Sequence, residues 1–421
     1  AMPFYDKGNW LVILLFAYCY FTYGRIYDAF LVSLNRISEM IYSQALAALV
    51  SDGILYIVTC LFSRRLINII PLILTFVLQI GFSAAWSLLA HHWYFSCFDP
   101  RKSIIVYDLN RGIKDLIDEY GLDKKFDVQK RLTIDACLRD LSQLDTAQNV
   151  FLAGVHSKER NIVLKYCVDK DIRMYIIPRI GDVIMSGAKK MHMFHLPMLR
   201  VGRYDPTPEF VITKRIFDIV MSGLALIVTS PVMLITAIAI KAYDKGPVFY
   251  KQCRLTKDGK EFYILKFRSM KVDAEKNTGA VLSAGKNDDR ITPVGRFIRM
   301  VRIDELPQFI NIFKGEMSIV GPRPERPEIA KEYEKELPEF KLRLQAKAGL
   351  TGYAQVYGKY NTTSYDKLQM DLMYIADPRF SEDLKICFAT VKILFMPEST
   401  EGVEVGKENA GVLEGVAAAK E

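Results

Sequence analysis

Paired cysteines and histidines are scarce in this sequence, and their scarcity excludes several kinds of site. The seven cysteines are scattered, their number is odd, and none forms a CxxC pair. We therefore expect neither a disulfide framework nor a zinc site, and a reducing cytosolic environment suits the polar part of the chain. The histidines number only five. We interpret those at 91, 92, 192 and 195 as structural or interfacial rather than as metal ligands.

A glycine-rich dinucleotide-binding loop is also missing. Where strand-like and helix-like segments begin to alternate, the first strand-to-helix turn runs from Asp108 to Gly112 and lacks GxGxxG. Nucleotide-sugar dehydratases and epimerases need such a loop, because its glycines let the backbone approach the pyrophosphate. The absence argues against that activity and favours a regulatory or structural role for this region.

Apolar residues are abundant, by contrast, at half of the 421 residues. This length predicts two or three domains. The formal net charge is +8, which suits nucleic acid, anionic lipid or a phosphorylated substrate as partner. Because the apolar content is high for a soluble enzyme, we expect membrane lipid to be the partner, and no nucleic acid.

Three long apolar segments open the chain, at residues 8–24, 40–63 and 66–98. Each approaches the roughly 20 residues that a helix needs to cross a bilayer, so we predict transmembrane helices within 1–98. The first has no basic stretch before it and no small-residue cleavage site after it, unlike a secretory signal. Asp52 is the one charged residue in the second segment. We interpret it as a polar contact between helices, with a functional role as the alternative.

Basic residues between these segments bear on their orientation. If the hydrophilic remainder is cytoplasmic, three crossings place the loop with Arg25 and Arg36 inside, as the positive-inside rule requires. The loop with Arg64 and Arg65 then lies outside, against the rule. We expect a cytoplasmic remainder, with this second loop as a contrary sign.

Residues 99–203 alternate between short apolar strands and helical segments. Helices are predicted at 113–120 and from the end of the third strand to 168, and strands at 103–109, 130–134, 149–154 and 173–178. This alternation predicts a small, doubly wound, Rossmann-like α/β domain. At the other end of the chain, residues 398–421 lack periodicity and are expected to form a loose tail.

An uncharged run, residues 219–240, follows a proline-containing linker predicted at 204–213. The run is long enough to span, but Ser230 and Pro231 lie in its middle, and proline breaks or kinks a helix. We predict a re-entrant hairpin over 216–242 that bends there, with the Ser230 hydroxyl as partner for a freed backbone group. A plain kinked transmembrane helix is the equal alternative.

The charges at the two ends of this run favour the hairpin. Basic residues at both ends place both ends on the cytoplasmic face. We also expect them to attract anionic lipid or a lipid phosphate. They are Lys214, Arg215, Lys241 and Lys245.

Two adjacent carboxylates, Asp304 and Glu305, precede a short apolar run in a strongly basic region. Spacing alone favours an ordinary helix cap with surface ion pairs. Carboxylates among many arginines also suit a site that handles a metal ion together with phosphate. The arginines are Arg290, Arg296, Arg299, Arg302, Arg323 and Arg326.

An apolar strand at 263–270, with the sequence YILKFRSM, lies upstream of the carboxylates. Its two cations, Lys266 and Arg268, are spaced so that both side chains share one face of a strand. Two cations on one face suit a diphosphate.

Several motifs in order give the chain a resemblance to a known family. They are the Lys214-Arg215-x-Phe217-Asp218 sequence, the Ser-Pro bend, KFRSM, the DELPQ run from Asp304, GPRP from Gly321 and TGYAQV from Thr351. Together they resemble the bacterial sugar transferases, also called polyprenyl-phosphate hexose-1-phosphate transferases or monotopic phosphoglycosyl transferases. The match covers 214–397, and the N-terminal spans with an α/β domain resemble the long-form members, which typically have four such spans where three are recognised here.

The resemblance implies an architecture and a reaction. The architecture is a membrane α/β protein, with a Rossmann-like domain and a C-terminal catalytic domain anchored by the re-entrant hairpin. The reaction moves sugar-1-phosphate from a nucleotide diphosphate sugar, expected to be a UDP-hexose, to undecaprenyl phosphate through a covalent aspartyl phosphosugar. It starts exopolysaccharide, capsule or O-antigen assembly at the cytoplasmic face of the bacterial inner membrane.

The resemblance also implies residue roles. Asp304 is the expected nucleophile and Glu305 the ligand of Mg²⁺. Lys266 and Arg299 are the expected phosphate contacts and Arg323 lies near the nucleotide, whereas Arg268 is a further substrate contact. Long-form relatives suggest a homodimer. A membrane scaffold without catalysis is the alternative, against which the intact Asp304–Glu305 pair argues.

Overall fold

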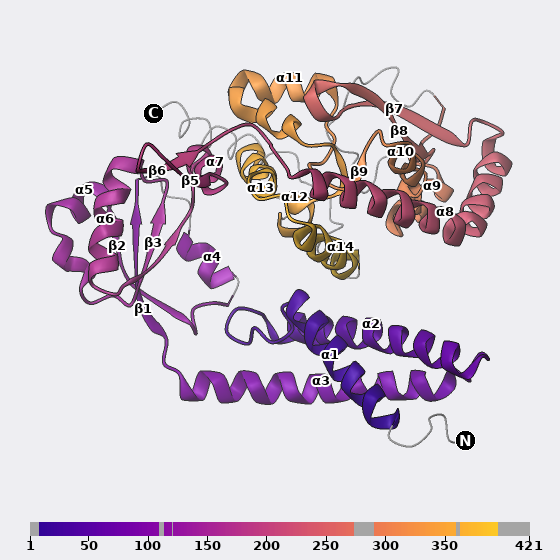
Figure 1. Cartoon of the computed structure of the whole chain (residues 1–421), viewed down its shortest axis with the longest axis horizontal. Helices are drawn as coiled ribbons and strands as arrows, with labels where there is room; N and C mark the ends of the chain where they lie inside the picture. Colours follow the sequence, from indigo (N-terminus) through magenta and orange to yellow (C-terminus); the bar gives the residue numbers. More distant parts are fainter. Residues whose placement is uncertain (1–7, 109–112, 120, 273–289, 359–362, 395–421) are drawn as a thin grey trace. The chain divides into compact units, whose positions relative to one another are not determined.

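The computed structural model describes residues 8–108, 113–119, 121–272, 290–358 and 363–394. The chain divides into two compact units, residues 1–178 and 179–421 (Figure 1). The predicted boundary between the α/β and transferase domains lay at 203–214. The segment 179–203 instead packs with the second unit.

Three apolar helices open the first unit: α1 (Gly8–Ile26), α2 (Ile37–Ser63) and α3 (Ile70–Cys97). α2 and α3 are long and apolar enough to cross a membrane, and α1 contains a shorter apolar stretch. The Asp52 carboxylate on α2 accepts a hydrogen bond from the Gln79 side chain of α3, at 3.3 Å. The interpretation of Asp52 as a polar contact between helices is therefore confirmed.

A four-stranded parallel sheet follows, in the order β2-β1-β3-β4. Alternate residues of β1 serve opposite faces, with Ile104 in one apolar core and Ile105 in another, and helices cover both faces. The second strand begins at Phe126, earlier than the predicted 130. The prediction missed its first residues because most of the strand's residues are polar and exposed, which hides the strand pattern in the sequence. The strands are β1 (Arg101–Tyr107), β2 (Phe126–Thr133), β3 (Asn149–Ala153) and β4 (Arg173–Ile176). The helices are α4 (Ile113–Glu119), α5 (Ile134–Arg139), the 3₁₀ turn η1 (Leu141–Leu144) and α6 (Ser157–Asp169).

The second unit begins with α7 (Ile180–Ser186) and an antiparallel hairpin of β5 (Lys189–Met193) and β6 (Leu196–Arg200). Val183 of α7 is buried in the core that α13 (Ser364–Ala376) helps to form. Gly187 lies so close to Ala376 that a Cβ there would meet its carbonyl oxygen at 2.4 Å. These contacts attach the segment to the C-terminal unit.

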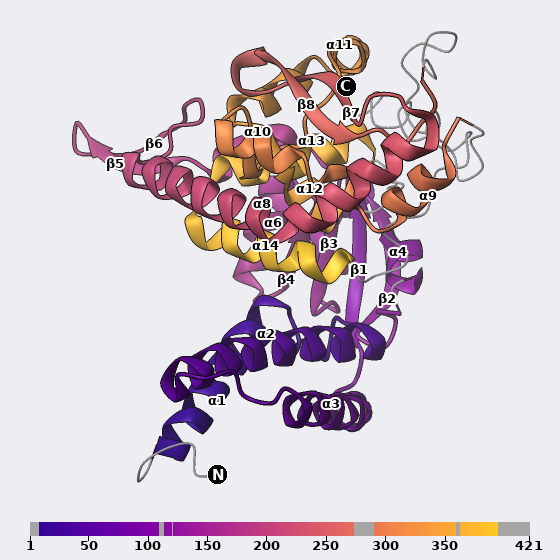
Figure 2. The ribbon, with the colours of Figure 1, turned by 90° about the vertical axis from the view of Figure 1, so that its right-hand side faces the viewer.

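The long apolar helix α8 (Pro208–Asp244) is continuous, with Pro231 inside it. It begins within the predicted linker, because the Thr207 hydroxyl accepts a hydrogen bond from the Phe210 amide and Pro208 suits the first turn. Its two halves run in different directions in both ribbon views (Figures 1 and 2). The proline removes the amide that would bond the Ile227 carbonyl, and the Ser230 hydroxyl donates to that carbonyl at 2.7 Å. The Ser230 hydroxyl is therefore the partner of the carbonyl that the proline frees.

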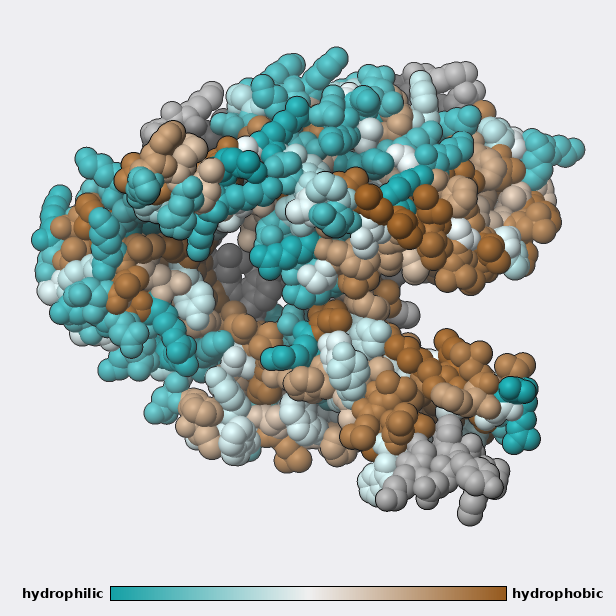
Figure 3. Space-filling model, in the orientation of Figure 1, coloured by the Kyte–Doolittle hydropathy of each residue, from teal (hydrophilic) through white to brown (hydrophobic). Residues whose placement is uncertain are grey.

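Exposed apolar side chains cover much of α8, among them Ile227, Val228 and Ile235. Figure 3 shows hydrophobic surface over this part of the second unit and over the N-terminal helices of the first. α8 is long and apolar enough to cross a membrane. Length and composition suit a crossing helix as well as a re-entrant one.

Polar contacts at the start of α8 fasten it to the rest of the unit. Asp218 accepts hydrogen bonds from the Ser318 hydroxyl and the Ile319 amide, at 3.1 and 3.0 Å. Lys214 pairs with the buried Asp383 at 2.6 Å, and Arg215 donates to the carbonyls of Ile312 and Phe313 in α10 (Gln308–Lys314). Lys214 is therefore neutralised by a carboxylate of the same unit, and the Arg215 guanidinium is bonded to backbone carbonyls of that unit.

The remaining elements surround two small sheets. β7 (Phe249–Leu255) pairs antiparallel with β8 (Glu261–Phe267) across the turn η2 (Lys257–Gly259), and β9 (Ser318–Val320) pairs parallel with β10 (Gly349–Thr351). The helices between them are α9 (Pro293–Met300), η3 (Ile303–Glu305), α10 (Gln308–Lys314), α11 (Pro327–Glu336) and η4 (Pro338–Gln345). The chain then forms α12 (Tyr353–Tyr357), α13 and α14 (Phe380–Leu394).

Candidate active site

The two carboxylates lie on the short turn η3, between α9 and α10. Arg302 precedes them in the left-handed backbone region, at φ 58°, which a residue with a side chain adopts at a cost. This reversal ends α9 and starts the turn. Pro307 follows at the N-cap position of α10, so the carboxylates stand next to the start of that helix.

Asp304 is buried, with 8% of its surface exposed. Among the described residues, none forms a hydrogen bond or ion pair with its carboxylate. Burial raises the pKa of Asp304, and the negative charge of Glu305 raises it further, against the opposing charges of Lys266, Arg299 and Arg302. A buried carboxylate without a fixed partner is available to react.

Glu305 lies in a different environment, although it is the next residue. The Lys266 ammonium donates to its carboxylate at 3.2 Å, and guanidinium groups of Arg302 and Arg323 lie at 4.0 Å. Burial disfavours its charge, but these three cations outweigh burial and lower its pKa to about 2. Glu305 is therefore anionic at neutral pH.

The predicted phosphate contacts divide into two groups. Lys266, Arg299 and Arg323 all influence the charges at Asp304 or Glu305, so the structure brings them together. Arg299 reaches the site from α9, and its Nε donates to the Ser269 hydroxyl at 2.9 Å. Arg323 comes from the loop after β9 and is half exposed.

Arg268 lies apart from this group. It follows the last residue of β8, and its guanidinium forms a two-pronged ion pair with Asp244 at the end of α8 and a 2.7 Å bond to the Pro247 carbonyl. Lys266 and Arg268 have different partners, since Lys266 pairs with Glu305 and Arg268 with Asp244. In this structure Arg268 fastens α8 to the sheet.

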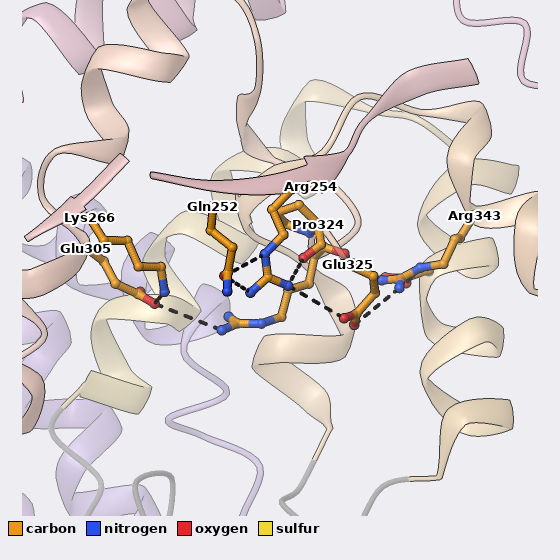
Figure 4. Close-up of polar contacts among 9 residues, drawn as sticks. Gln252, Arg254, Lys266, Glu305, Pro324, Glu325 and Arg343 are labelled. Atoms are coloured by element: carbon orange, nitrogen blue, oxygen red, sulfur yellow. Dashed lines mark hydrogen bonds and ion pairs between the residues drawn. The ribbon is translucent and has the colours of Figure 1, made fainter. Parts of the chain in front are cut away.

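Three other arginines bear on the site without having been assigned a role from the sequence. Arg302 contacts Glu305 directly, and its place in the run of arginines was the only signal for it. Arg343 is almost fully buried and contacts the loop that carries Arg323, as does Arg254 (Figure 4). The sequence carries no signal for Arg343, because its partners lie on other elements.

Glycines make the close packing behind Arg323 possible. A Cβ on Gly321 would lie 2.3 Å from the Lys347 carbonyl oxygen, and one on Gly352 would lie 2.1 Å from the Gly321 carbonyl oxygen. The Gly321 amide donates to Thr351, and the Gly349 amide to Pro322. The GPRP and TGYAQV motifs are therefore neighbours, and their glycines are needed for backbone contact.

The family described as "Bacterial sugar transferase" matches residues 209–397. A UDP-N-acetylgalactosamine-undecaprenyl-phosphate N-acetylgalactosaminephosphotransferase of Aeromonas hydrophila is 36% identical over 62% of this chain and 59% of its own. Two UDP-glucose:undecaprenyl-phosphate glucose-1-phosphate transferases are also similar. That of Klebsiella pneumoniae is 42% identical over 43% of this chain and 40% of its own, and that of Caulobacter vibrioides 37% identical over 48% and 76%. The chain belongs to the bacterial sugar transferase family.

The matched part of the first two relatives is about half of their length, at 59% and 40%. Asp304, Glu305 and the four cations that act on them all fall within the stretch that matches the bacterial sugar transferases; the cations are Lys266, Arg299, Arg302 and Arg323. The α/β domain lies outside it. The family match therefore bears on the C-terminal unit and on the site described above.

The residues present at the site fit a hydrated Mg²⁺ that arrives with a diphosphate. No cluster of three or more potential metal ligands occurs among the described residues. Mg²⁺ commonly binds through one or two carboxylates, with waters and substrate phosphates as its other ligands. Glu305, which stays anionic, and Asp304, whose carboxylate has no partner in the described part of the chain, supply that donor set.

Proposed function

We propose that this bacterial sugar transferase moves a sugar-1-phosphate from a UDP-sugar to undecaprenyl phosphate. The proposal rests above all on one observation: a buried Asp304 without a partner among the described residues, next to a Glu305 kept anionic by three cations. The names of the relatives, which specify UDP-sugars and undecaprenyl phosphate as substrates, support the substrate class. Because those names include both glucose and N-acetylgalactosamine, the proposed donor is a UDP-hexose.

In the first step an Asp304 carboxylate oxygen attacks the phosphorus that carries the sugar. A phosphorus–oxygen bond forms to Asp304, and the bond from that phosphorus to the oxygen bridging the two phosphates breaks. UMP leaves with the electron pair of the broken bond. Lys266, Arg299 and Arg323 are placed to neutralise the phosphoryl oxygens, which otherwise repel an anionic nucleophile.

In the second step an oxygen of undecaprenyl phosphate attacks the same phosphorus. The bond between phosphorus and Asp304 breaks, the carboxylate is restored, and undecaprenyl-diphosphate-sugar is formed. Covalent catalysis divides one difficult transfer into two displacements. The soluble nucleotide therefore leaves before the lipid acceptor enters the same site.

Mg²⁺ belongs to the proposal as a cofactor held by Glu305, with Asp304 beside it. When bound, it supplies positive charge that polarises the phosphoryl oxygens and orients the diphosphate. The other roles belong to residues of the chain. Asp304 is the nucleophile, and Lys266, Arg299 and Arg323 hold the phosphates.

The membrane setting completes the proposal. α8 enters the inner membrane from the cytoplasm, bends at Ser230 and Pro231 and returns, so that the site stays at the cytoplasmic surface where lipid phosphates lie. The reaction is then the first membrane step of exopolysaccharide, capsule or O-antigen assembly. We also propose a homodimer, because the chain resembles the long-form members. The molecular mass of the protein in detergent solution tests this.

Asp304→Asn tests the assignment of the nucleophile. An amide cannot form the phosphosugar bond, so UMP release should fall by at least about a thousandfold, the scale seen when a nucleophile is removed. The measurement is UMP release from a panel of UDP-hexoses by purified protein with Mg²⁺ and undecaprenyl phosphate. The same panel identifies the sugar.

The control is Asp205→Asn, at an exposed carboxylate that pairs with Lys189 of β5. It should release UMP at the wild-type rate. A fold check by thermal unfolding accompanies both variants. Normal turnover by a folded Asp304→Asn protein would refute the nucleophile assignment.

A further inference from the structure

The Arg323 guanidinium depends on its loop for its position. Residues 321–326 between β9 and α11 belong to no helix or strand. The Arg323 side chain is 48% exposed, and its Nη2 atom lies 4.0 Å from the Glu305 carboxylate. A long, half-exposed side chain loses conformational entropy when it is held in one place. Whatever holds the loop backbone therefore decides how often Arg323 faces Glu305.

Two guanidinium groups hold that backbone from behind. Arg343 Nη2 donates to the Arg323 carbonyl oxygen at 2.9 Å, and Arg254 Nη1 donates to the Pro324 carbonyl oxygen at 3.0 Å. The Arg343 side chain is 4% exposed and that of Arg254 18%. Two successive peptide carbonyls are thus bound by charged donors, one buried and one part-buried, and charged donors form the stronger class of hydrogen bond.

Carboxylates join these two arginines into one network. Glu325 lies between them, with its two oxygens 3.4 Å from Arg343 Nη1 and 3.8 Å from Arg254 Nη1. Asp371 of α13, 1% exposed, accepts from Arg343 Nε and Nη2 at 2.8 and 2.7 Å. Gln252 of β7 accepts from Arg254 at the other end. Figure 4 shows Arg343 at one end of this line of contacts and Lys266 with Glu305 at the other.

Stability alone does not account for such a network. A buried ion pair can often be replaced by apolar side chains of similar size at little cost in stability, because the desolvation penalty offsets the attraction. Asp371 does not use all the N–H donors of Arg343. The remaining donors point to the Arg323 carbonyl and to Glu325. The network therefore fixes the loop that carries an active-site cation.

We propose that Arg343, anchored by Asp371, is a positioning residue for the sugar-phosphate transfer: it fixes the backbone at Arg323 so that the Arg323 guanidinium faces Glu305 and the donor phosphates. Arg343 touches no substrate in this account and acts through Arg323 alone. The inference rests on the proposed function, and it assigns the buried Asp371–Arg343 pair to that site.

A double-mutant cycle tests this dependence. The change is Arg343→Met together with Asp371→Leu, which leaves neither charge of the pair stranded, while Glu325 keeps Arg254. We expect kcat/KM for UMP release to fall about tenfold or more, because small misplacements of a positioning group are costly. In an Arg323→Ala background the same pair of changes should alter kcat/KM less than about twofold, since Arg323 is no longer there to be positioned.

A matched control uses another buried ion pair of the same unit. Lys214 and Asp383 are 13% and 1% exposed, and their ion pair joins α8 to α14. Lys214→Met with Asp383→Leu should change kcat/KM by the same factor in the wild-type background as in the Arg323→Ala background. Equal losses from the Arg343–Asp371 changes in both backgrounds would overturn the proposal.

Hydrogen exchange of residues 321–326 separates failure of this inference from failure of the proposed function. The Arg343–Asp371 variant should exchange faster than wild type in this segment, and the Lys214–Asp383 variant should not. If the wild-type protein releases no UMP, the proposed function fails and exchange alone decides whether the network holds the loop. Unchanged exchange would overturn the inference whatever the activity.

Discussion

Asp304 and Glu305 are neighbours of similar chemistry whose environments separate their properties. Burial and the adjacent charge raise the pKa of Asp304. Three cations hold the pKa of Glu305 at about 2. The pair therefore suits two different roles, with Glu305 as a permanent anion and Asp304 as the group whose protonation sets the acid limit of activity.

Removing the charge of Glu305 should lower the pKa of Asp304. In Glu305→Gln the anion that raises the Asp304 pKa is gone, while Lys266, Arg299 and Arg302 remain. The Asp304 carboxylate should then stay ionised to lower pH than in the wild type. The measurement is a ¹³C titration of carboxyl-labelled aspartate in metal-free protein, with Asp304→Asn to assign the signal.

The sign of this change is open to refutation. An Asp304 signal that titrates at the same or a higher pH in Glu305→Gln would contradict the electrostatic account. The matched control is Glu382→Gln, at a carboxylate paired with Lys385 on α14. It should leave the Asp304 titration where it is in the wild type.

Residue types alone identified side chains that meet at the site, but they did not identify those that are used elsewhere. The adjacency of Asp304 and Glu305 is visible in the sequence, and so is the excess of arginine around them. Arg268 looked equivalent to Lys266, but it pairs with Asp244 at the end of another element. Alternation along a strand says nothing about partners brought in by tertiary packing.

At the scale of the element, α8 shows how one proline is accommodated in an apolar helix. The Ile227 carbonyl loses its amide partner at Pro231 and receives the Ser230 hydroxyl instead. In a bilayer an unpaired carbonyl is costly, because lipid offers no donor. The Ser-Pro pair is therefore a unit, in which the serine offsets the loss that the proline causes.

Ser230→Ala should destabilise the protein only while Pro231 is present. With Pro231, the change leaves the Ile227 carbonyl without a partner and should cost about 1 kcal/mol. In a Pro231→Ala background the restored amide bonds that carbonyl, and Ser230→Ala should cost almost nothing. Thermal unfolding in nanodiscs measures all four proteins.

Thr229→Val is the matched control for this cycle. Its hydroxyl donates to the Ala225 carbonyl, which the Thr229 amide also serves as in any α-helix. This change should have the same small effect with and without Pro231. If Ser230→Ala lowers stability by the same amount with and without Pro231, the proposal that the serine compensates for the proline is wrong.

At the scale of the whole molecule, the path of α8 through the membrane decides where the site lies. A re-entrant α8 keeps both of its ends on the cytoplasmic side. Glu209→Cys and Lys245→Cys, at exposed positions near those ends, should therefore both resist an impermeant maleimide in intact cells and react after permeabilisation. Exposed Lys165→Cys on α6 reports the side of the α/β domain and should behave in the same way.

Reaction of the cysteines at 209 and 245 from opposite faces would establish a crossing helix and refute the re-entrant path. The native Cys97 is exposed and is replaced by serine in every variant, so that it adds no signal. The result would leave the geometry around Asp304 unaffected, because that geometry lies within one unit.

The sequence by itself determined the apolar helices, the α/β alternation, the Ser-Pro bend and the two carboxylates, because each depends on residues close together in the chain. Tertiary structure decided which distant cations meet those carboxylates and which are used elsewhere. Arg302 is only three residues from Glu305, but Lys266 reaches it from β8 and Arg323 from the loop after β9. Lys214 and Arg268 are neutralised by partners on other elements. A charge acts on its spatial neighbours, and for these residues the fold chooses the neighbours.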